Sequence, residues 1–541
     1  MFIPREAAAF GMEQSQVTDI IAQILSNHET GANIMIQNER ILDVAMIKKF
    51  YVKRNFRSAW LNNDIRMSRA HELLDAIQEA YADGLIPEYY HLSKIKLLLR
   101  EVQLNDTPYA SAHWKKSAEL DLLLSDAFFL LSCHLSSGCV NPVAVEAEWF
   151  SDNGVIDVIA VLEKGLQENT IKESLRNLIP REKMYHRLRQ ALANYRSIQS
   201  RGGWTAVSPG ASLKIEMRDA RVAELRQRLI RSGDLSHEAE DTGDLFNHTI
   251  EKAVIRFQGR HGLHPDGVVG PKTIYELNVS VQERVRQIEL NLERLRWSFR
   301  NLGSQYILVN IADYRLEVVE DRKTVLAMKV IVGKPYWHTP VFSAEMTYLE
   351  INPAWNVPDS ILQDDLLPKI KNDPNYITEQ NFIVLDGWDE NAEHIDPLVI
   401  DWTTVTGENF PYRLRQEPGP SNPLGRIKFM FPNKFNVYLH DTPHTALFEK
   451  NVRTFSHGCI RLSQPMSAAA YLLQDDKEWT KEKLLQAVDS GETQIVRLKH
   501  PVRVHILYLT AWVDTNGLVQ FREDIYSRDE RLDRALKKPP F

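Results

Sequence analysis

A short segment, TFSHGCIRL at positions 454–462, combines a cysteine with groups that would make its thiol a working nucleophile. Gly458 has no Cβ, so a substrate carbonyl could approach the backbone closely just before Cys459. The N–H groups of Gly458 and Cys459 could then donate hydrogen bonds to a developing oxyanion. Arg461 adds a fixed positive charge suited to a substrate carboxylate, and we expect this charge and a neighbouring histidine to lower the pKa of the thiol. The pattern suits a nucleophilic Cys459, whereas a lone cysteine is most often a small buried hydrophobic residue, and the residue types alone leave both interpretations open.

A nucleophilic cysteine needs a general base, and two histidines are candidates. His440 ends the predicted strand KFNVYLH, in which alternation places Tyr438 and His440 on one face. Asp441 follows directly and could orient the imidazole. His457 is the rival, because it lies two residues before Cys459, where it could also share a face with the thiol and compete with it. The sequence leaves the choice between the two histidines open.

The same residue types could instead bind zinc, with ligands drawn from His440, His444, His457 and Cys459. Pro443 breaks any helix between His440 and His444, so these two do not share a helical face. No HExxH pattern is present. We therefore predict neither a metal nor an organic cofactor.

The composition is that of a globular protein with several domains: 541 residues, 43% hydrophobic, 25% charged and a net charge of -7. No basic excess indicates a nucleic acid or an anionic membrane surface as partner. We find no apolar run of the ~18 residues that a transmembrane segment needs. The N-terminus has no basic stretch followed by a long apolar one, so no clear signal peptide is expected at this start.

Three cysteines are too few for a disulfide framework. Cys133 and Cys139 lie close together in LSCHLSSGCV, where a local disulfide is one possibility. We favour the simpler interpretation, two small residues near a helix end.

The hydrophobic patterns predict an α+β, multidomain fold. The stretch SRAHELLDAIQEAY, for example, places Leu73, Leu74, Ile77 and Tyr81 on one helical face, and Gly84 follows as a stop signal. After Gly303 the pattern changes to the alternation of β-strands. The predicted parts are a helical scaffold domain (1–200), a second helical module (215–282), a mostly β catalytic domain (304–500) with a loop-rich lid insertion (358–422), and a C-terminal hairpin and tail (501–541) with a turn at Asn516-Gly517.

The strings VYLHDTP and SHGCIRL together resemble the catalytic motif of YkuD-type L,D-transpeptidases, a histidine, a spacer and then Ser/Thr-His-Gly-Cys. His440 and Ser456-His457-Gly458-Cys459 match this motif position by position. The flanking strings INPAWNVP, PGPSNPLGRIKFMFPN and FREDIY are similar to the YcbB-like branch of the family. A separate string, RFQGRHGLHPDGVVGPKT at 256–273, resembles the peptidoglycan-binding domain found beside many wall enzymes.

The resemblance implies a peptidoglycan L,D-transpeptidase. Such an enzyme takes the acyl group of a tetrapeptide stem at its third residue, a meso-diaminopimelate, as a thioester on Cys459. It then passes the acyl group to the side-chain amine of a second stem, which makes a 3→3 cross-link. His440 would be the base, oriented by the backbone carbonyl or the carboxylate of Asp441, and Tyr438 would lie near the oxyanion. The expected substrate contacts are Tyr438, Ser456, Arg461 and Trp355.

The resemblance also implies inhibition by carbapenems and a location in the periplasm of a Gram-negative bacterium. Two alternatives remain within the same chemistry: an L,D-carboxypeptidase, in which water discharges the acyl-enzyme, and attachment of a protein to the wall through a lysine amine. A third alternative is a non-catalytic wall-binding protein. Acceptor choice would depend on the lid and the acceptor cleft, so the catalytic motif does not separate these activities.

Overall fold

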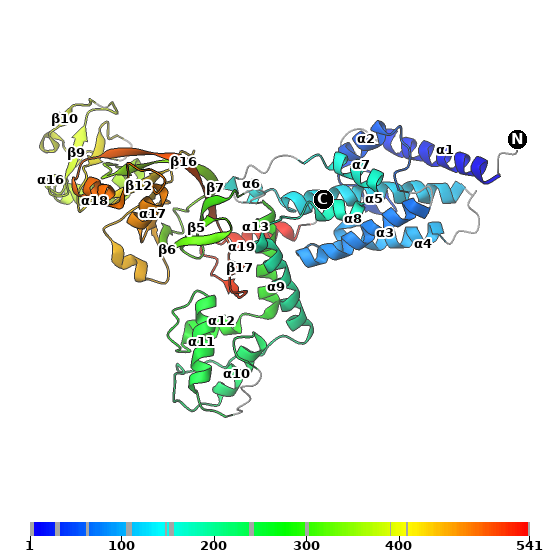
Figure 1. The fold of residues 1–541 in the computed structure, drawn as a ribbon, viewed down its shortest axis with the longest axis horizontal. Coiled ribbons are helices and arrows are strands. Elements are labelled where there is room, and N and C mark those ends of the chain that lie inside the picture. Colours follow the sequence, from blue (N-terminus) through cyan, green and yellow to red (C-terminus); the bar gives the residue numbers. More distant parts are fainter. Residues whose placement is uncertain are drawn as a thin grey trace. The chain divides into compact units, whose positions relative to one another are not determined.

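The structure is a computed structural model that describes residues 5–27, 33–60, 64–103, 111–145, 149–150, 156–236, 243–297, 302–389, 391–406 and 409–538. The chain divides into two units, whose helices and strands are labelled in Figure 1. The helical unit comprises Met1–Ala147, Ser151–Asn301 and Thr510–Phe541, and the β unit comprises Glu148–Phe150 and Leu302–Leu509.

The helical unit has an N-terminal bundle, a small three-helix module and a long connecting helix. The bundle helices are α1 (Arg5–Ser26), α2 (Val44–Lys53), α3 (Asp64–Glu79), α4 (Leu92–Gln103), α5 (Ser111–Ser137), α6 (Pro142–Val145), α7 (Val158–Glu168), α8 (Ile171–Arg176) and α9 (Lys183–Ser200), with short 3₁₀ turns at Ala80–Asp83 and Pro87–Tyr90 and a small ribbon of β1 (Met35–Ile36) and β2 (Glu39–Arg40). The module helices are α10 (Arg221–Arg231), α11 (His248–Arg260) and α12 (Pro271–Asn278), followed by α13 (Val281–Trp297) and, in the C-terminal tail, α19 (Arg528–Leu536). The helical scaffold and second helical module predicted from the sequence are thus both present.

Helix α3 shows how the periodic pattern translates into packing. Leu73, Leu74 and Ile77 are buried in the bundle core, as predicted from their spacing. Gly84 takes a left-handed conformation (φ 77°) just after the following 3₁₀ turn, which a glycine adopts without a Cβ penalty. Tyr81 was predicted on the same buried face, and this was wrong, because the 3₁₀ turn rotates it outward to 54% exposure under the guanidinium of Arg196.

Helix α5 corrects the expectation that no segment is long and apolar enough to cross a membrane. Within the described residues, this one helix is long and apolar enough by length and composition. Most of its apolar stretch is buried among the other helices of the bundle, and the core helix of a globular domain has the same character. Its buried Asp121 accepts hydrogen bonds from Tyr51, Ser58 and two backbone N–H groups, which ties the preceding loop to the helix.

The β unit is built on a sheet that returns to its own first strand. Its strands run in the order β12-β13-β15-β6-β5-β4-β16-β7, and β7 pairs with β12 as well as with β16, so the path closes as in a barrel. The bounds are β3 (Trp149–Phe150), β4 (Gln305–Asn310), β5 (Arg315–Glu320), β6 (Lys323–Gly333), β7 (Val341–Ile351), β12 (Ile427–Met430), β13 (Leu439–His440), β14 (Thr454–Ser456), β15 (Ile460–Leu462) and β16 (Gln494–Leu507), with helices α17 (Pro465–Leu472) and α18 (Lys481–Asp489) and the 3₁₀ turn Thr445–Glu449. The mostly β domain predicted after Gly303 is therefore present.

The segment predicted as a loop-rich lid is a folded subdomain, which we call the cap (Trp355–Gln416). It has its own four-stranded sheet in the order β10-β9-β11-β8 and its own apolar core. Its elements are β8 (Trp355–Asn356), α14 (Asp359–Ile361), a π-helical turn (Leu362–Leu366), α15 (Leu367–Asn372), α16 (Tyr376–Glu379), β9 (Phe382–Leu385), β10 (His394–Ile395), a 3₁₀ turn (Pro397–Val399) and β11 (Arg413–Gln416). The sheet was not predicted, because two of its strands are only two residues long.

One domain boundary and one turn predicted at the C-terminal end need correction. The division after residue 500 falls inside β16, which continues to Leu507 and pairs with β4 and β7. The hairpin itself is present as β17 (Ala511–Val513) and β18 (Val519–Phe521), and Gly517 is in its turn. Its connection is a five-residue loop closed by the Asp514 carboxylate, which accepts the N–H groups of Asn516 and Leu518, rather than a two-residue turn.

Candidate active site

Four polar side chains meet on one face of the sheet because two short strands lie in parallel. β13 pairs with β15 in a register that places Leu439 opposite Ile460 and His440 opposite Arg461. The pairing extends one residue back, where the Ile460 N–H donates to the Tyr438 carbonyl at 3.1 Å. Side chains alternate along each strand, so the residues directly before and after Leu439 and Ile460 point to the opposite face of the sheet. That face holds Tyr438, His440, Cys459 and Arg461, while Leu439 and Ile460 are buried on the other side.

The imidazole of His440 is held by the backbone and not by a carboxylate. Nδ1 of His440 lies 2.6 Å from the carbonyl oxygen of Asp441, which accepts a hydrogen bond only from a protonated Nδ1 and so favours the tautomer in which Nε2 is the proton acceptor. The Asp441 carboxylate instead accepts the N–H groups of Arg426 and Thr442 at 2.8 and 2.7 Å. Of the two orienting groups considered from the sequence, the structure favours the carbonyl.

His440 is buried (4% exposed) and uncharged. Burial lowers the pKa of its imidazole to about 3, and the positive charges of Arg461 and Lys428 act in the same direction. The imidazole is therefore neutral at neutral pH and able to accept a proton.

The thiol of Cys459 has a raised pKa, contrary to the expectation from the sequence. Burial raises it, and this outweighs the lowering by hydrogen bonds from the backbone and hydroxyl of Tyr438 and by the charges of Lys428 and Arg461. The sulfur also lies 3.9 Å from the Asn436 carbonyl. Thiol and imidazole are therefore both neutral at rest.

Lys428 is a site residue that the sequence analysis missed. It pairs with His440 across β12 and β13, its Nζ lies 4.5 Å from the centre of the Tyr438 ring, and it forms an ion pair with Glu350 at 3.0 Å. Nothing in the local string RIKFMF marks it out, since its role depends on the pairing of β12 with β13. Lys428 and Arg461 together make the surroundings of the thiol electropositive.

The turn before Cys459 depends on Gly458, whose φ of 110° favours glycine. Ser456 Oγ accepts the Gly458 N–H at 3.2 Å and donates to the Cys459 carbonyl at 2.5 Å. The Gly458 N–H is thus engaged within the turn, which does not support its expected role as an oxyanion donor. The Cys459 N–H has no hydrogen-bond partner in the part of the chain that the structure describes, and it remains available.

His457 faces a different environment from His440. Its ring packs edge-on to Trp337 at 5.2 Å, and its Nε2 lies 3.3 Å from the carboxylate of Asp365 in the π-helical turn of the cap. Burial lowers the pKa of His457, and the charge of Lys334 adds to this while Asp365 opposes it. His457 therefore joins the catalytic turn to the cap, whereas His440 shares Tyr438, Lys428 and Arg461 with the thiol.

Trp355 and Arg461 are the remaining predicted substrate contacts. Trp355 is 8% exposed and belongs to the apolar core of the cap, which packs against Tyr438. Trp355 is thus a core residue of the cap, and its contact with substrate stays a prediction. Arg461 is partly buried, and its Nε has no hydrogen-bond partner in the described residues.

Within the described residues, no group of three or more His, Cys, Asp or Glu side chains could hold a metal ion, and His444 is exposed, away from the buried His440. Cys133, Cys139 and Cys459 are all free thiols. A disulfide between Cys133 and Cys139, one of the two possibilities considered, is therefore not formed.

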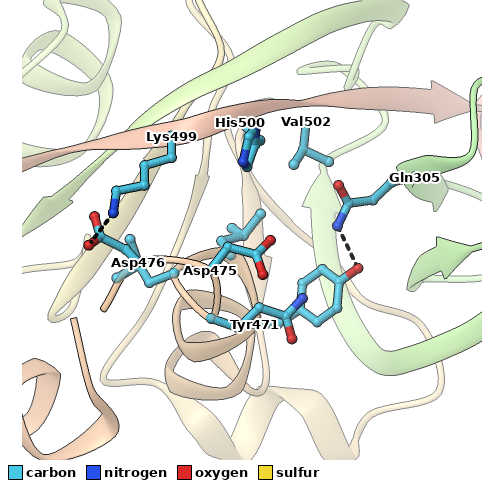
Figure 2. A pocket seen from close by; sticks show the side chains of 10 residues that line it. Gln305, Tyr471, Asp475, Asp476, Lys499, His500 and Val502 are labelled. Atoms are coloured by element: carbon cyan, nitrogen blue, oxygen red, sulfur yellow. Dashed lines mark hydrogen bonds and ion pairs between the residues drawn. The ribbon is translucent and has the colours of Figure 1, made fainter. Parts of the chain in front are cut away.

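A polar hollow elsewhere in the β unit is separate from this site. Figure 2 shows Tyr471 and Asp475 on one side of it and Lys499 and His500 on the other. It is crossed by an ion pair between Lys499 and Asp476 (2.9 Å), and Gln305 donates a hydrogen bond to Tyr471 (2.8 Å). None of its lining residues belongs to the Cys459 face.

A thiol, a neutral imidazole and an unengaged backbone N–H on one face of a sheet are the groups that a cysteine acyltransferase needs. Residues 304–481 match the YkuD family, described as the L,D-transpeptidase catalytic domain, and residues 218–277 match a family described as "Putative peptidoglycan binding domain". Residues 45–192 match a family described as a scaffold domain. The chain therefore carries a YkuD-family L,D-transpeptidase catalytic domain together with a peptidoglycan-binding domain. The YcbB-like branch stays a prediction.

A curated relative supports the same assignment. A protein of Haemophilus influenzae named "Putative L,D-transpeptidase" is 36% identical over 252 residues, which are 46% of this chain and 49% of that protein. The match thus spans about half the length of the relative.

Among solved structures, an L,D-transpeptidase from Mycobacterium smegmatis aligns with 38% of this chain and 58% of its own, at 12% identity and a TM-score of 0.18. An L,D-transpeptidase from Stackebrandtia nassauensis aligns with 56% of this chain and 96% of its own, at 12% identity and a TM-score of 0.20. TM-scores this low add nothing to the assignment.

Proposed function

We propose that this chain is a peptidoglycan L,D-transpeptidase that forms 3→3 cross-links through a thioester on Cys459. The observation that carries the proposal is the shared face on which Tyr438, His440, Cys459 and Arg461 meet. The peptidoglycan-binding domain supports the wall as the substrate, and a stem peptide with meso-diaminopimelate at its third position is the proposed acyl donor. The proposed location is accordingly the periplasm of a Gram-negative bacterium.

In the first half-reaction, the Cys459 sulfur attacks the carbonyl carbon of the third stem residue while Nε2 of His440 accepts the thiol proton. The negative charge that forms on the carbonyl oxygen is stabilised by the Cys459 N–H, and the Tyr438 hydroxyl, which contacts the sulfur, is the second donor. The bond to the fourth residue then breaks, and its amine leaves with the proton from His440. The product is the thioester.

In the second half-reaction, the side-chain amine of another stem attacks the thioester carbonyl. His440 accepts a proton from this amine and returns a proton to the sulfur as the carbon–sulfur bond breaks. Arg461, whose buried Nε has no hydrogen-bond partner among the residues that the structure describes, supplies a positive charge for a substrate carboxylate. His457 is proposed to position the turn through Trp337 and Asp365, and not to act as the base.

The test combines intact-protein mass spectrometry with product analysis. Exposure to a carbapenem should add one adduct to the wild-type protein and none to the Cys459→Ala variant, in which turnover is also lost while the thermal unfolding temperature is nearly unchanged. With purified tetrapeptide stems, the wild-type protein should form a 3→3 dimer. An adduct at Cys133 or Cys139, or one on the Cys459→Ala variant, would contradict the nucleophile. If tripeptide is the only product, the activity is that of a carboxypeptidase and not that of a cross-linking enzyme.

A further inference from the structure

Two hydroxyl groups hold the backbone around the nucleophile. Ser456, which belongs to the motif, fixes the Gly458 N–H and the Cys459 carbonyl, as described above. Thr339, which lies more than a hundred residues earlier in the chain, donates from Oγ1 to the Gly458 carbonyl at 2.8 Å. The same oxygen accepts the N–H of Gly333 at the end of β6, at 2.9 Å. Thr339 has no exposed surface, so water does not compete for either hydrogen bond.

These hydrogen bonds hold three consecutive peptide groups. Ser456 holds the peptide that precedes Gly458 and the peptide that follows Cys459, whereas Thr339 holds the one between Gly458 and Cys459. A trans peptide is planar, and its carbonyl and N–H point in opposite directions. Once Thr339 fixes the direction of the Gly458 carbonyl, the direction of the Cys459 N–H is fixed as well.

This central peptide is also the one that local sterics leave least constrained. Gly458 has no Cβ and takes a φ of 110°, so its own side chain cannot keep the following peptide plane in place. A Cβ at this position would lie 3.3 Å from the His338 carbonyl oxygen, and the φ of 110° would strain any residue that carries one. A restraint from outside the turn is therefore required, and Thr339 provides it.

We propose that Thr339 is a positioning residue for acyl transfer, which orients the Cys459 N–H as an oxyanion donor by holding the Gly458 carbonyl. The inference rests on the proposed function, since an oxyanion forms only if Cys459 is acylated. The segment between β6 and Thr339 strengthens the case. Lys334 donates its N–H to the Ser456 carbonyl at 2.9 Å, and β6 pairs with β14. Thr339 therefore joins two segments of the chain that are already hydrogen-bonded to each other.

The test separates two reactions of the same thiol. Alkylation by iodoacetamide has no oxyanion, whereas acylation by a carbapenem does. The Thr339→Val variant keeps the shape of the side chain and lacks the hydroxyl. It should be alkylated at the wild-type rate within about twofold. It should be acylated about 10- to 100-fold more slowly. This is less than the loss of a whole oxyanion donor, on the order of 10²–10³ in rate, because the Cys459 N–H is still present and only its orientation is released. Thr339→Ser keeps the hydroxyl and should restore most of the acylation rate.

The matched control is Thr493→Val. The Thr493 hydroxyl also donates to a backbone carbonyl, that of Asn352 at 2.7 Å, but it lies outside the site, so both rates should stay at wild-type levels. If Thr339→Val does not fold, Thr339→Ser and Thr339→Ala lack the same methyl group and differ by the hydroxyl alone. The serine variant should then acylate at least about tenfold faster.

Equal acylation of wild type and Thr339→Val, equal rates for the serine and alanine variants, or a parallel loss of alkylation and acylation would overturn the positioning role and leave the proposed function intact. Failure of the wild-type protein to be acylated, with Cys459 still alkylated, would overturn the proposed function and this inference together.

Discussion

The pH dependence of thiol alkylation tests the resting state of the site most directly. Burial raises the pKa of Cys459 above the usual range and lowers that of His440 to about 3, so thiol and imidazole are both neutral between these values. A thiol with a pKa above about 8.5 is at most about 3% ionised at pH 7, and its thiolate fraction rises about tenfold per pH unit below the pKa. The alkylation rate of Cys459 should therefore rise about 100-fold between pH 6 and pH 8. A preformed thiolate–imidazolium pair, with a thiol pKa of about 4, would give a flat profile over this range.

The assay is the rate of iodoacetamide incorporation at Cys459, followed by peptide mass spectrometry so that Cys133 and Cys139 are counted separately. The His440→Gln variant removes any assistance by the imidazole and should show the same rise with pH. Tyr438→Phe removes a hydrogen bond that lowers the thiol pKa, so its profile should lie at higher pH than that of the wild type. A wild-type rate that is constant from pH 6 to pH 8 would refute the neutral pair.

Two further predictions concern the histidines. With tetrapeptide stems as substrate, His440→Gln should lower kcat for cross-linking by about 10²–10⁴-fold, the usual contribution of a general base. His457→Gln should lower kcat less, because His457 contacts the cap. The reverse ranking of the two variants would assign the base to His457. The β unit should also lose stability in acid. In the folded protein the pKa of His440 is about 3 and that of His505 is about 4, against about 6.5 in the unfolded chain. The contribution of these two neutral histidines to the free energy of unfolding is therefore fully present above about pH 6.5 and falls as the pH drops towards the folded pKa values. Each of the two should contribute a slope of about 1.4 kcal/mol per pH unit between about pH 6 and pH 4.5, and urea unfolding of His440→Gln should show a slope smaller by that amount; an unchanged slope would show that His440 is not buried as a neutral group.

The predicted nucleophile and the strand face of the predicted base were found in the sequence because both depend on local patterns. Gly458 before Cys459 and the alternation of Tyr438 and His440 are features of short strings. The pairing of β13 with β15, which brings these strings together, is a long-range contact that no local pattern encodes. Only the family resemblance joined them before the structure was known.

Residues that act through tertiary contacts were missed for the same reason. Lys428 reaches the site through the pairing of β12 with β13, and Thr339, in the loop after β6, reaches it through hydrogen bonds to Gly333 and Gly458. Both look like ordinary strand or loop residues in the sequence. The cap was predicted as a lid because its Pro and Gly positions interrupt the strand pattern, yet its two-residue strands β8 and β10 complete a sheet with a core of its own. Short elements of this kind are stabilised by packing and not by local propensity.

The sign of the thiol pKa shift was wrong because the sequence shows charges but not burial. Arg461 does favour the thiolate, as anticipated, and so does Lys428, but the desolvation of the sulfur is the larger effect.

This outcome changes how the site must work. With a weakly acidic thiol beside a weakly basic imidazole, the ion pair is unfavourable before substrate arrives, so the proton has to move as the carbon–sulfur bond forms. In the proposed mechanism, the negative charge then passes directly from sulfur to the carbonyl oxygen, next to the Cys459 N–H that Thr339 is proposed to orient. Reactivity consequently depends on a carbonyl that can accept this charge in the right place. A resting thiol of this kind is slow towards simple electrophiles and fast only towards acyl donors that reach the oxyanion donors, which favours acyl transfer over accidental modification of Cys459.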